Sequence, residues 1–301
     1  MQDYKLFVAL DAVLKEQSFD KAAKRLHITQ SAVSQRIKLL ETEYGEPLLI
    51  RSQPIQATAL GQKLLGHYQR VLQLESELDK QLNKEKQLQT LPLAVNADSL
   101  ATWFVDALAP LLKQHQIELN LYVEDESKTW ERLSNGEVLA CVTSKKKVMA
   151  GGESHFLGYM QYFCVATPDF IARYFPEGVN KDNLQLAPAI TFDQHDDMHI
   201  RFLTDHFSLQ QGQYPCHTVR SSHGFVDLTL AHGAYSLNSN LHIEQYLKTG
   251  ELINLMPDKI VYIPLYWHCW QLSGSLINQL TQAMIEHCQK ILIQSPRNNS
   301  Y

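Results

Sequence analysis

Residues 19–52 read FDKAAKRLHITQSAVSQRIKLLETEYGEPLLIRS, and the spacing of their apolar side chains predicts two consecutive helices. Apolar residues recur every three or four positions in 19–26 and again in 30–44, as on one face of an amphipathic helix. Thr29 is a favourable N-cap for the second helix, and Gly45 is a suitable C-terminal stop. Two short helices joined by a tight turn predict a helix-turn-helix motif.

The outer face of the second helix carries short and amide side chains in its first two turns, where a solvated helix usually carries Glu and Lys. Glutamine can pair with adenine through two hydrogen bonds, and serine and lysine suit phosphate or guanine. We therefore place the helix-turn-helix at about residues 19–38 and expect its second helix to enter the major groove of double-stranded DNA. On pattern alone, a small three-helix core with a polar face is the alternative. The candidate DNA-contacting residues of this helix are Thr29, Gln30, Ser31, Ser34, Gln35 and Lys38.

The flanking sequence extends this motif into a winged helix-turn-helix domain over residues 2–58. Residues 4–15 have apolar side chains at helical spacing and predict a preceding helix. The apolar run 48–50 and the turn around Pro54 predict a two-stranded wing, which places Arg51 near the phosphate backbone.

A long linker helix is predicted over residues 59–88, with Thr58 as its N-cap. Leu64, Val71 and Leu78 recur every seven residues, a spacing that lasts for about three repeats. An apolar stripe of this kind on a single helix needs another helix to pack against. The same helix of a second copy of the chain is the simplest partner. We therefore expect a homodimer or homotetramer, which would present paired recognition helices to a two-fold operator.

The charge of the 301-residue chain is divided at about residue 90. Its 27 basic and 32 acidic residues give a net charge of −5, which alone argues against a nucleic-acid partner. The first 90 residues hold 13 basic and 11 acidic residues, and the remainder holds 14 and 21, so the balance is +2 on the head and −7 on the body. This division favours two modules with different partners.

Cysteine usage and hydropathy favour a cytoplasmic protein. The five cysteines are scattered and form no CxxC pair, which argues for a reducing compartment and against a disulfide framework or a structural zinc site. No apolar run approaches the roughly 18 residues of a membrane span, and the N-terminus has no signal-peptide pattern. We expect no membrane association.

From residue 91 onward, strand-like apolar runs alternate with helical patterns and predict an α/β body with a mostly parallel, doubly wound sheet. Two long strand candidates, 158–166 and 260–270, are separated by about a hundred residues and could be crossovers between two lobes. A clamshell of this kind holds a small ligand between its lobes. The predicted body spans 91–301, with lobe I at about 91–162 and 268–301 and lobe II at about 163–267.

The N-terminal motifs resemble those of the LysR-type transcriptional regulators. The Ala22–Ala23 pair, the TQSAVS start of the second helix, the IKLLE continuation and the GEPLLIR wing stand in the order expected for that family. The resemblance implies a DNA-binding regulator with a two-lobed, periplasmic-binding-protein-like effector domain, no cofactor and no catalytic residues.

Within that family, the body is similar to the arginine/lysine-responsive regulators of amino-acid export, also described as chromosome-initiation inhibitors. The matching stretches are LAVNADSLATW, LYVEDES, ERLSNGEV, ITFDQHDDMH, ELINL and LYWH. The chain departs from related regulators at 238–240, where Asn-Ser-Asn replaces an apolar step ending in proline. Its wing is also less basic, with Gln-Pro-Ile-Gln-Ala at 53–57.

The candidate effector-binding residues lie at predicted strand ends and helix starts. Ser99 stands where a carboxylate would meet free N–H groups at a helix N-terminus, although a plain N-cap explains it equally well. Asp125 lies between two glutamates. This acidic segment either binds an amino group at the edge of the cleft or is a solvated turn. Acidic groups facing one cleft would favour lysine or arginine as effector. The full set is Asn96, Ser99, Thr102, Asp125, Asp193 and Asp197.

Other functions are less well supported by the sequence. His195 and His199 lie among aspartates, but no HExxH pattern accompanies them, and we expect no metal site. No GxSxG motif or phosphate-binding glycine loop indicates an enzyme. A solute-binding protein would need a signal sequence. A replication-origin or nucleoid-binding protein would use the same DNA-binding head, and a regulator sensing a different small metabolite is a further alternative.

Overall fold

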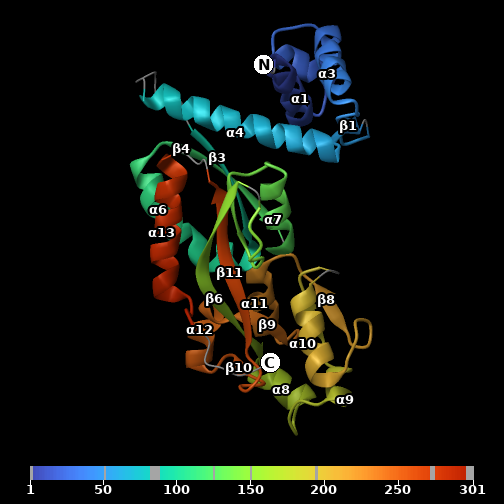
Figure 1. Cartoon of the computed structure of the whole chain (residues 1–301). Coiled ribbons are helices and arrows are strands. Elements are labelled where there is room, and N and C mark those ends of the chain that lie inside the picture. The colour runs from blue at the N-terminus through green and yellow to red at the C-terminus, as the bar shows by residue number, and fades with distance from the viewer. Residues whose placement is uncertain are drawn as a thin grey trace.

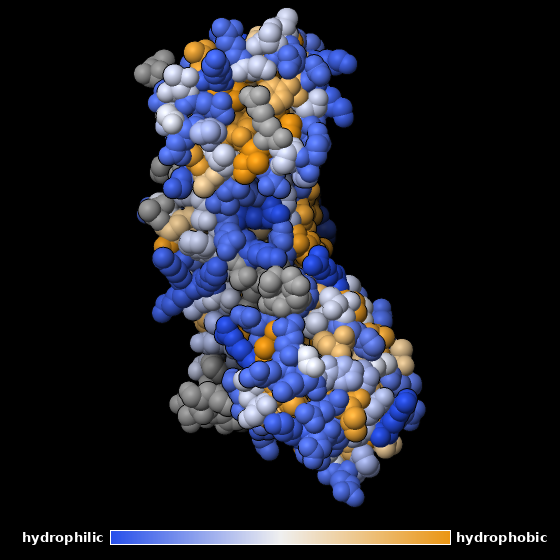
Figure 2. Space-filling view, turned by 90° about the vertical axis from the view of Figure 1, so that its right-hand side faces the viewer, coloured by the Kyte–Doolittle hydropathy of each residue, from blue (hydrophilic) through white to orange (hydrophobic). Residues whose placement is uncertain are grey.

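The chain forms an N-terminal head, one long helix and an α/β body, as the computed structural model in Figure 1 shows. Hydrophilic residues predominate on the face shown in Figure 2, and hydrophobic residues form separate areas on it. Within the described part of the chain, no helix combines the length and the apolar character that a membrane span requires. The structure describes residues 3–50, 52–81, 89–124, 126–149, 151–193, 196–271 and 275–295.

The head is a three-helix domain with a two-stranded wing, as predicted. Ser18 caps its second helix by accepting a hydrogen bond from Lys21 N, and Thr29 caps the third by accepting one from Ala32 N at 3.2 Å. Gly45 ends the third helix with φ +75°, which confirms the predicted stop. The elements are α1 (Tyr4–Glu16), α2 (Phe19–Arg25), α3 (Gln30–Tyr44), β1 (Leu49–Ile50) and β2 (Gln56–Ala57).

The long helix α4 (Ala59–Gln81) begins after Thr58, whose Oγ1 accepts a hydrogen bond from Gly61 N at 3.1 Å. Its first turns complete the core of the head, where Leu64 and Tyr68 are buried. Leu64 therefore belongs to the core of the head. This differs from the expectation that the whole heptad stripe of α4 packs against a partner helix. The side chain of Leu78 and the predicted continuation to residue 88 lie outside the described residues.

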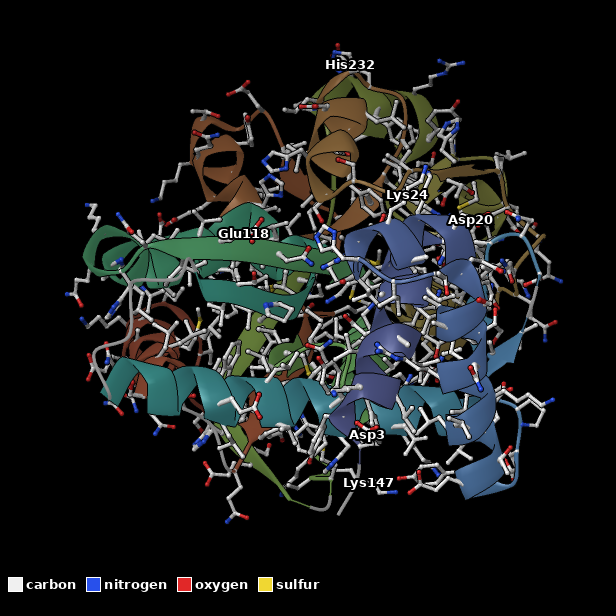
Figure 3. All side chains as sticks on the ribbon, turned by 90° about the horizontal axis from the view of Figure 1, so that it is seen from above. Asp3, Asp20, Lys24, Glu118, Lys147 and His232 are labelled. Atoms are coloured by element: carbon white, nitrogen blue, oxygen red, sulfur yellow. The ribbon has the colours of Figure 1, made fainter. Side chains whose placement is uncertain are left out.

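Viewed from above, the head lies over one end of α4, and the strands of the body extend to the other side (Figure 3). A glycine pair connects the long helix to the body. A Cβ atom on Gly136, in the turn after α7 (Glu126–Ser134), would lie 1.9 Å from Gly66 Cα in α4. Gly136 also has φ +75°, a conformation that favours glycine. The backbones of α4 and of this turn are therefore in direct contact.

The body has one large sheet with strand order β10-β6-β11-β5-β3-β4, and β9 pairs with β6. The β3–β4 and β3–β5 pairs are parallel, whereas β11–β5, β11–β6, β10–β6 and β9–β6 are antiparallel. The expectation of a mostly parallel sheet is therefore wrong for this sheet, because the two long strands run between the lobes in opposite directions. The strands are β3 (Gln89–Asn96), β4 (Ile117–Glu124), β5 (Ala140–Thr143), β6 (Gly152–Ala166), β7 (Ala189–Thr191), β8 (Cys216–Thr218), β9 (Ser236–Ser239), β10 (Ile253–Asn254) and β11 (Val261–Trp270).

The long strands β6 and β11 pair from Val261–Tyr162 to Trp270–Gly152, with one register shift between Leu265 and Tyr266. Beside this bulge, Tyr159 forms an isolated bridge with Ile293, in the chain after the last helix. The two strands cross between lobes I and II where the sequence predicts crossovers. The other helices of the body are α5 (Ala97–Ser99), the π-helix η1 (Leu100–Phe104), α6 (Val105–Gln114), α8 (Pro168–Tyr174), α9 (Lys181–Leu184), α10 (Asp197–Phe207), α11 (Ser222–Leu230), α12 (Asn240–Thr249) and α13 (Ser275–Ile291).

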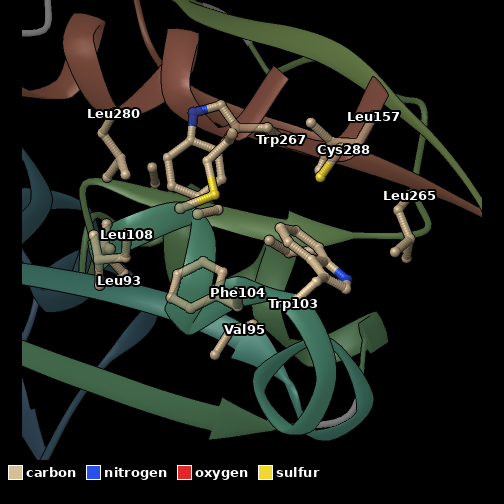
Figure 4. Close-up of a cluster of buried hydrophobic side chains, with 14 of the residues drawn as sticks. Leu93, Val95, Trp103, Phe104, Leu108, Leu157, Leu265, Trp267, Leu280 and Cys288 are labelled. Atoms are coloured by element: carbon tan, nitrogen blue, oxygen red, sulfur yellow. The ribbon is translucent and has the colours of Figure 1, made fainter. Parts of the chain in front are cut away.

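Each lobe has its own hydrophobic core. In lobe I, Trp103 and Phe104 of η1 pack with Trp267 of β11 and with Leu280 and Cys288 of α13 (Figure 4). A separate cluster in lobe II contains Phe170, Phe175, Leu203, Tyr235 and Leu237. The lobes also meet where η1 of lobe I packs against α12 of lobe II, and this contact is called the seam between the lobes.

Candidate functional site

The outer face of α3 presents the predicted DNA-contacting side chains to solvent. Gln30, Ser31, Gln35 and Lys38 are exposed, and Ser34 is half-buried. Val33, Ile37 and Leu40 on the opposite face are buried in the head core. Arg51 lies outside the described residues.

The first turn of α3 is suited to approach a phosphate. It contains no acidic residue, and its exposed N-terminus offers backbone N–H groups and the positive end of the helix dipole. Thr29 Oγ1 and Ser31 Oγ lie 3.0 Å apart in a hydrogen bond, so both hydroxyls are held at this end. The exposed N-terminus is open to a phosphate of the DNA backbone, and base contacts by Gln35 and Lys38 stay predictions.

At the seam between the lobes, Asp98 accepts hydrogen bonds from two other elements. Tyr162 OH of β6 donates to Asp98 Oδ2 at 2.7 Å, and Ser222 Oγ, at the start of α11 in lobe II, donates to Asp98 Oδ1. Both donors are neutral hydroxyls. Asp98 therefore joins the lobes, and it has no ion pair to a Lys or Arg among the described residues.

Several polar atoms near this carboxylate are buried without a hydrogen-bond partner among the described residues. They are Asn96 Oδ1 and Ser99 Oγ at the end of β3 and the start of α5, and Ser239 Oγ at the end of β9. Ser239 pairs in register with Tyr162, so both side chains lie on one face of the β6–β9 pair. Unpartnered buried oxygens are costly, and a polar ligand would satisfy them.

The helix at this position begins three residues earlier than the sequence suggests. Ala97 is its first residue and Asn96 holds the N-cap position, without a side-chain capping bond. Ser99 is thus not the cap but a fully buried residue of the first turn. Thr102, one turn further, donates its hydroxyl proton to Asp98 O at 2.6 Å.

Two histidines lie on the lobe II side of the seam. The rings of His223 in α11 and His242 in α12 meet edge to face, with centroids 4.7 Å apart. Burial and the neighbouring His223 lower the pKa of His242, against the opposing influence of Asp98 and Asp227. His242 is therefore mainly neutral at pH 7 and does not compensate the charge of Asp98.

The predicted acidic residues have different surroundings. Asp125 lies outside the described residues, and its neighbour Glu124 forms an ion pair with Arg132. The buried Asp193 lies 3.8 Å from an Arg220 nitrogen, whereas the side chain of Asp197 is 72% exposed and pairs with Arg201 of its own helix.

Asn96, Ser99 and Thr102 lie together at one helix start, where α5 leads into η1. The described ion pairs of Asp193 and Asp197 are instead with Arg220 and Arg201 of lobe II.

The departure at 238–240 forms a buried polar network. Asn238 Nδ2 donates to Ser236 Oγ at 2.6 Å, and Ser236 Oγ lies 2.7 Å from Thr229 Oγ1 of α11. Asn240 begins α12. The polar residues thus connect β9 to α11 on the lobe II side of the seam.

His199, considered above as a metal ligand, is a core residue. It is 1% exposed and lies between Tyr214 and Tyr235, with ring centroids 5.7 and 5.9 Å away. Burial lowers its pKa to about 4, so it is neutral at pH 7. His195 lies outside the described residues.

Sequence reasoning missed the contacts of Asp98, although the residue lies within the ADS motif. Its partners Tyr162 and Ser222 are 64 and 124 residues away. A polar pair inside the long strand or at a helix start has no local signature, so only the folded arrangement identifies these residues.

Comparison with known proteins agrees with this architecture. Residues 4–62 match the model of the bacterial regulatory helix-turn-helix protein, lysR family, and residues 84–292 match that of the LysR substrate binding domain. The HTH-type transcriptional regulator ArgP of Aeromonas salmonicida is 51% identical over 292 residues, which cover 96% of this chain and 98% of that protein.

Two solved structures also resemble the chain along its length. The crystal structure of ArgP from Mycobacterium tuberculosis has a TM-score of 0.87 and 30% identity, covering 98% of this chain and all of that one. Full-length LysG from Corynebacterium glutamicum, with bound effector Arg, has a TM-score of 0.80 and 31% identity, covering 97% and 100%. This chain belongs to the LysR family of helix-turn-helix transcriptional regulators.

Proposed function

We propose that the chain is a cytoplasmic transcriptional regulator that binds promoter DNA through α3 and responds to arginine or lysine. The observation that carries the effector assignment is Asp98, a carboxylate at the seam whose partners among the described residues are neutral hydroxyls. The relative LysG binds Arg, which supports a cationic amino acid as the ligand. The similar proteins reported above are transcriptional regulators, which supports regulation rather than catalysis.

In this proposal, the cationic group of the effector lies against Asp98. Ser99 Oγ, Asn96 Oδ1 and Ser239 Oγ, which lack partners in the described structure, receive its remaining polar groups. Thr102, Asp125, Asp193 and Asp197 stay predicted contacts. Because Asp98 already bridges the lobes, an effector there changes how the lobes are joined, which is the differential contact that allosteric control requires.

Self-association accompanies DNA binding in this proposal. Leu72 and Leu74 of α4 are exposed, at 36% and 46%, beyond the turns that complete the head. A second α4 packed along them gives the homodimer or homotetramer that we expect, with paired α3 helices for a two-fold operator.

Calorimetric titration of arginine, lysine and the neutral analogues citrulline and norleucine tests the effector assignment. We expect binding of the two cationic amino acids only. Asp98→Asn should weaken it at least about tenfold, about 1.4 kcal/mol, because it removes the counter-charge. Asp106→Asn, at an exposed position of α6, is the matched control and should bind as the unmodified chain does. Equal binding of citrulline, or full affinity in Asp98→Asn, would disprove this assignment.

Footprinting and anisotropy on genomic fragments test the DNA interface. The double variant Gln35→Ala with Lys38→Ala should lose site-specific protection, and binding should weaken steeply as salt rises. Protection at a few promoter sites supports the regulator. Many weak AT-rich sites would instead support an origin-binding or nucleoid-binding role.

A further inference from the structure

Three side chains with metal-ligating atoms meet in lobe I, away from the seam between the lobes. The ligand atoms of Glu153, His155 and Cys269 all lie within 4.8 Å of one another. Cys269 of β11 pairs in register with Glu153 of β6, and Trp267 pairs with His155. Opposite residues of an antiparallel pair share a face of the sheet, so all three side chains project to the side covered by α13.

The spacing of these atoms approaches that of a coordination shell. His155 Nε2 lies 3.3 Å from Glu153 Oε2. Two ligand atoms at about 2.0–2.2 Å from a tetrahedral Zn²⁺ are separated by roughly 3.3–3.6 Å. The Cys269 sulfur lies within 4.8 Å of both atoms and would move inward to complete a three-ligand set.

The ligand atoms are available to an ion. His155 Nε2 is buried and has no hydrogen-bond partner among the described residues, despite its closeness to Glu153. Cys269 Sγ lies in a long hydrogen bond, 3.8 Å from Thr281 Oγ1 of α13. The side chains of His155 and Glu153 are 31% and 44% exposed, which leaves a path from solvent.

We propose that Glu153, His155 and Cys269 bind a divalent transition-metal ion, with Zn²⁺ as the best match. A sulfur and an imidazole nitrogen select Zn²⁺ over Mg²⁺ or Ca²⁺, which prefer oxygen ligands. The ion binds a carboxylate oxygen, His155 Nε2 and the Cys269 thiolate, with water in the fourth position. The thiol proton of Cys269 passes to solvent on binding. The ion then ties the lobe I ends of β6 and β11 together.

Cobalt substitution in the reduced, full-length chain tests this site. We expect one equivalent of Co²⁺ to give the near-ultraviolet thiolate charge-transfer band and the visible bands of tetrahedral coordination, and Zn²⁺ to displace it. Cys269→Ser should abolish the charge-transfer band. Cys288→Ser, which removes another buried thiol, in α13 itself, is the matched control and should retain it.

His155→Ala, at a partly exposed position, provides a second test that does not depend on a core substitution. It should weaken Zn²⁺ binding about tenfold or more in competition with a chromogenic chelator, with an unchanged circular dichroism spectrum. Zn²⁺ should also raise the melting temperature of the unmodified chain but not of His155→Ala. Absence of stoichiometric Co²⁺ and Zn²⁺ binding, or equal affinity in His155→Ala, would overturn the proposal.

Discussion

Ser99 and Ser239 are residues whose hydroxyls can contribute to ligand binding while contributing little to the free energy of folding. Each is buried, and its hydroxyl oxygen has no hydrogen-bond partner among the described residues. An unpaired buried hydroxyl contributes nothing favourable to folding, so its removal is close to neutral. The same hydroxyl gains a partner when a polar ligand arrives.

Ser99→Ala should therefore separate stability from binding. We expect the free energy of unfolding of the effector-free chain to change by less than about 0.5 kcal/mol, or to rise, because the unpaired oxygen is lost. Arginine binding measured by calorimetry should become weaker. A large loss of stability would instead assign Ser99 a structural role.

The buried His199 predicts how the stability of lobe II depends on pH in the acid range. Its pKa is lowered from 6.5 to about 4 by burial, so between these values the unfolded chain binds a proton that the folded chain does not. The free energy of unfolding should therefore fall as the pH decreases from about 6.5 to 4, by at most about 1.4 kcal/mol per pH unit from this group. Urea unfolding of His199→Gln, which cannot titrate, should show a shallower decrease, and identical pH profiles would contradict this account.

At the scale of the element, the start of α4 depends on one hydroxyl. Thr58 Oγ1 accepts from Gly61 N at 3.1 Å and donates to Pro47 O at 2.8 Å, which ties the helix to the segment before the wing. Thr58→Ala should lower the free energy of unfolding by about 1 kcal/mol. Thr42→Ala is the control and should be nearly neutral, because the described bond of Thr42 Oγ1 runs back to Lys38 O within α3. If the two variants lower the free energy of unfolding by urea equally, the cap at Thr58 does not contribute the expected stability.

The caps and the buried face of α3 were predictable because their signals are local. The capping bonds of Thr29, Gly45 and Thr58 join residues within four positions, and the structure confirms all three. The mostly parallel sheet was a wrong prediction, because apolar runs carry no information on strand direction. The partners of Asp98 lie far along the chain, and the Glu153–Cys269 pairing likewise joins distant strands, so neither could be predicted from the sequence.

At the scale of the whole molecule, the glycine contact connects the DNA-binding head to the body through α4. Gly136→Ala combines strained backbone, about 1–3 kcal/mol, with a collision against Gly66. We expect a lower melting temperature and a larger radius of gyration in small-angle scattering, because α4 must move away from the body.

Gly250→Ala is the matched control for this prediction. Gly250 has φ +78°, close to the +75° of Gly136, but a Cβ atom there would meet nothing within 4 Å. It should show the backbone strain alone, without a change in scattering. If both variants behave alike, the contact between α4 and the body does not determine their arrangement.

The paired strands β6 and β11 also set the kind of motion that is open to the two lobes. A two-stranded ribbon resists shearing along its hydrogen bonds but twists readily, and a bulge concentrates that twist at one point. Here the bulge lies beside the Tyr159–Ile293 bridge, which holds a third segment against the same point. We therefore expect an effector at the seam to rotate lobe II about this point as a torsion rather than to slide it. The response reaching α4 is then a change of angle, which a dimer can convert into a new separation of its two recognition helices.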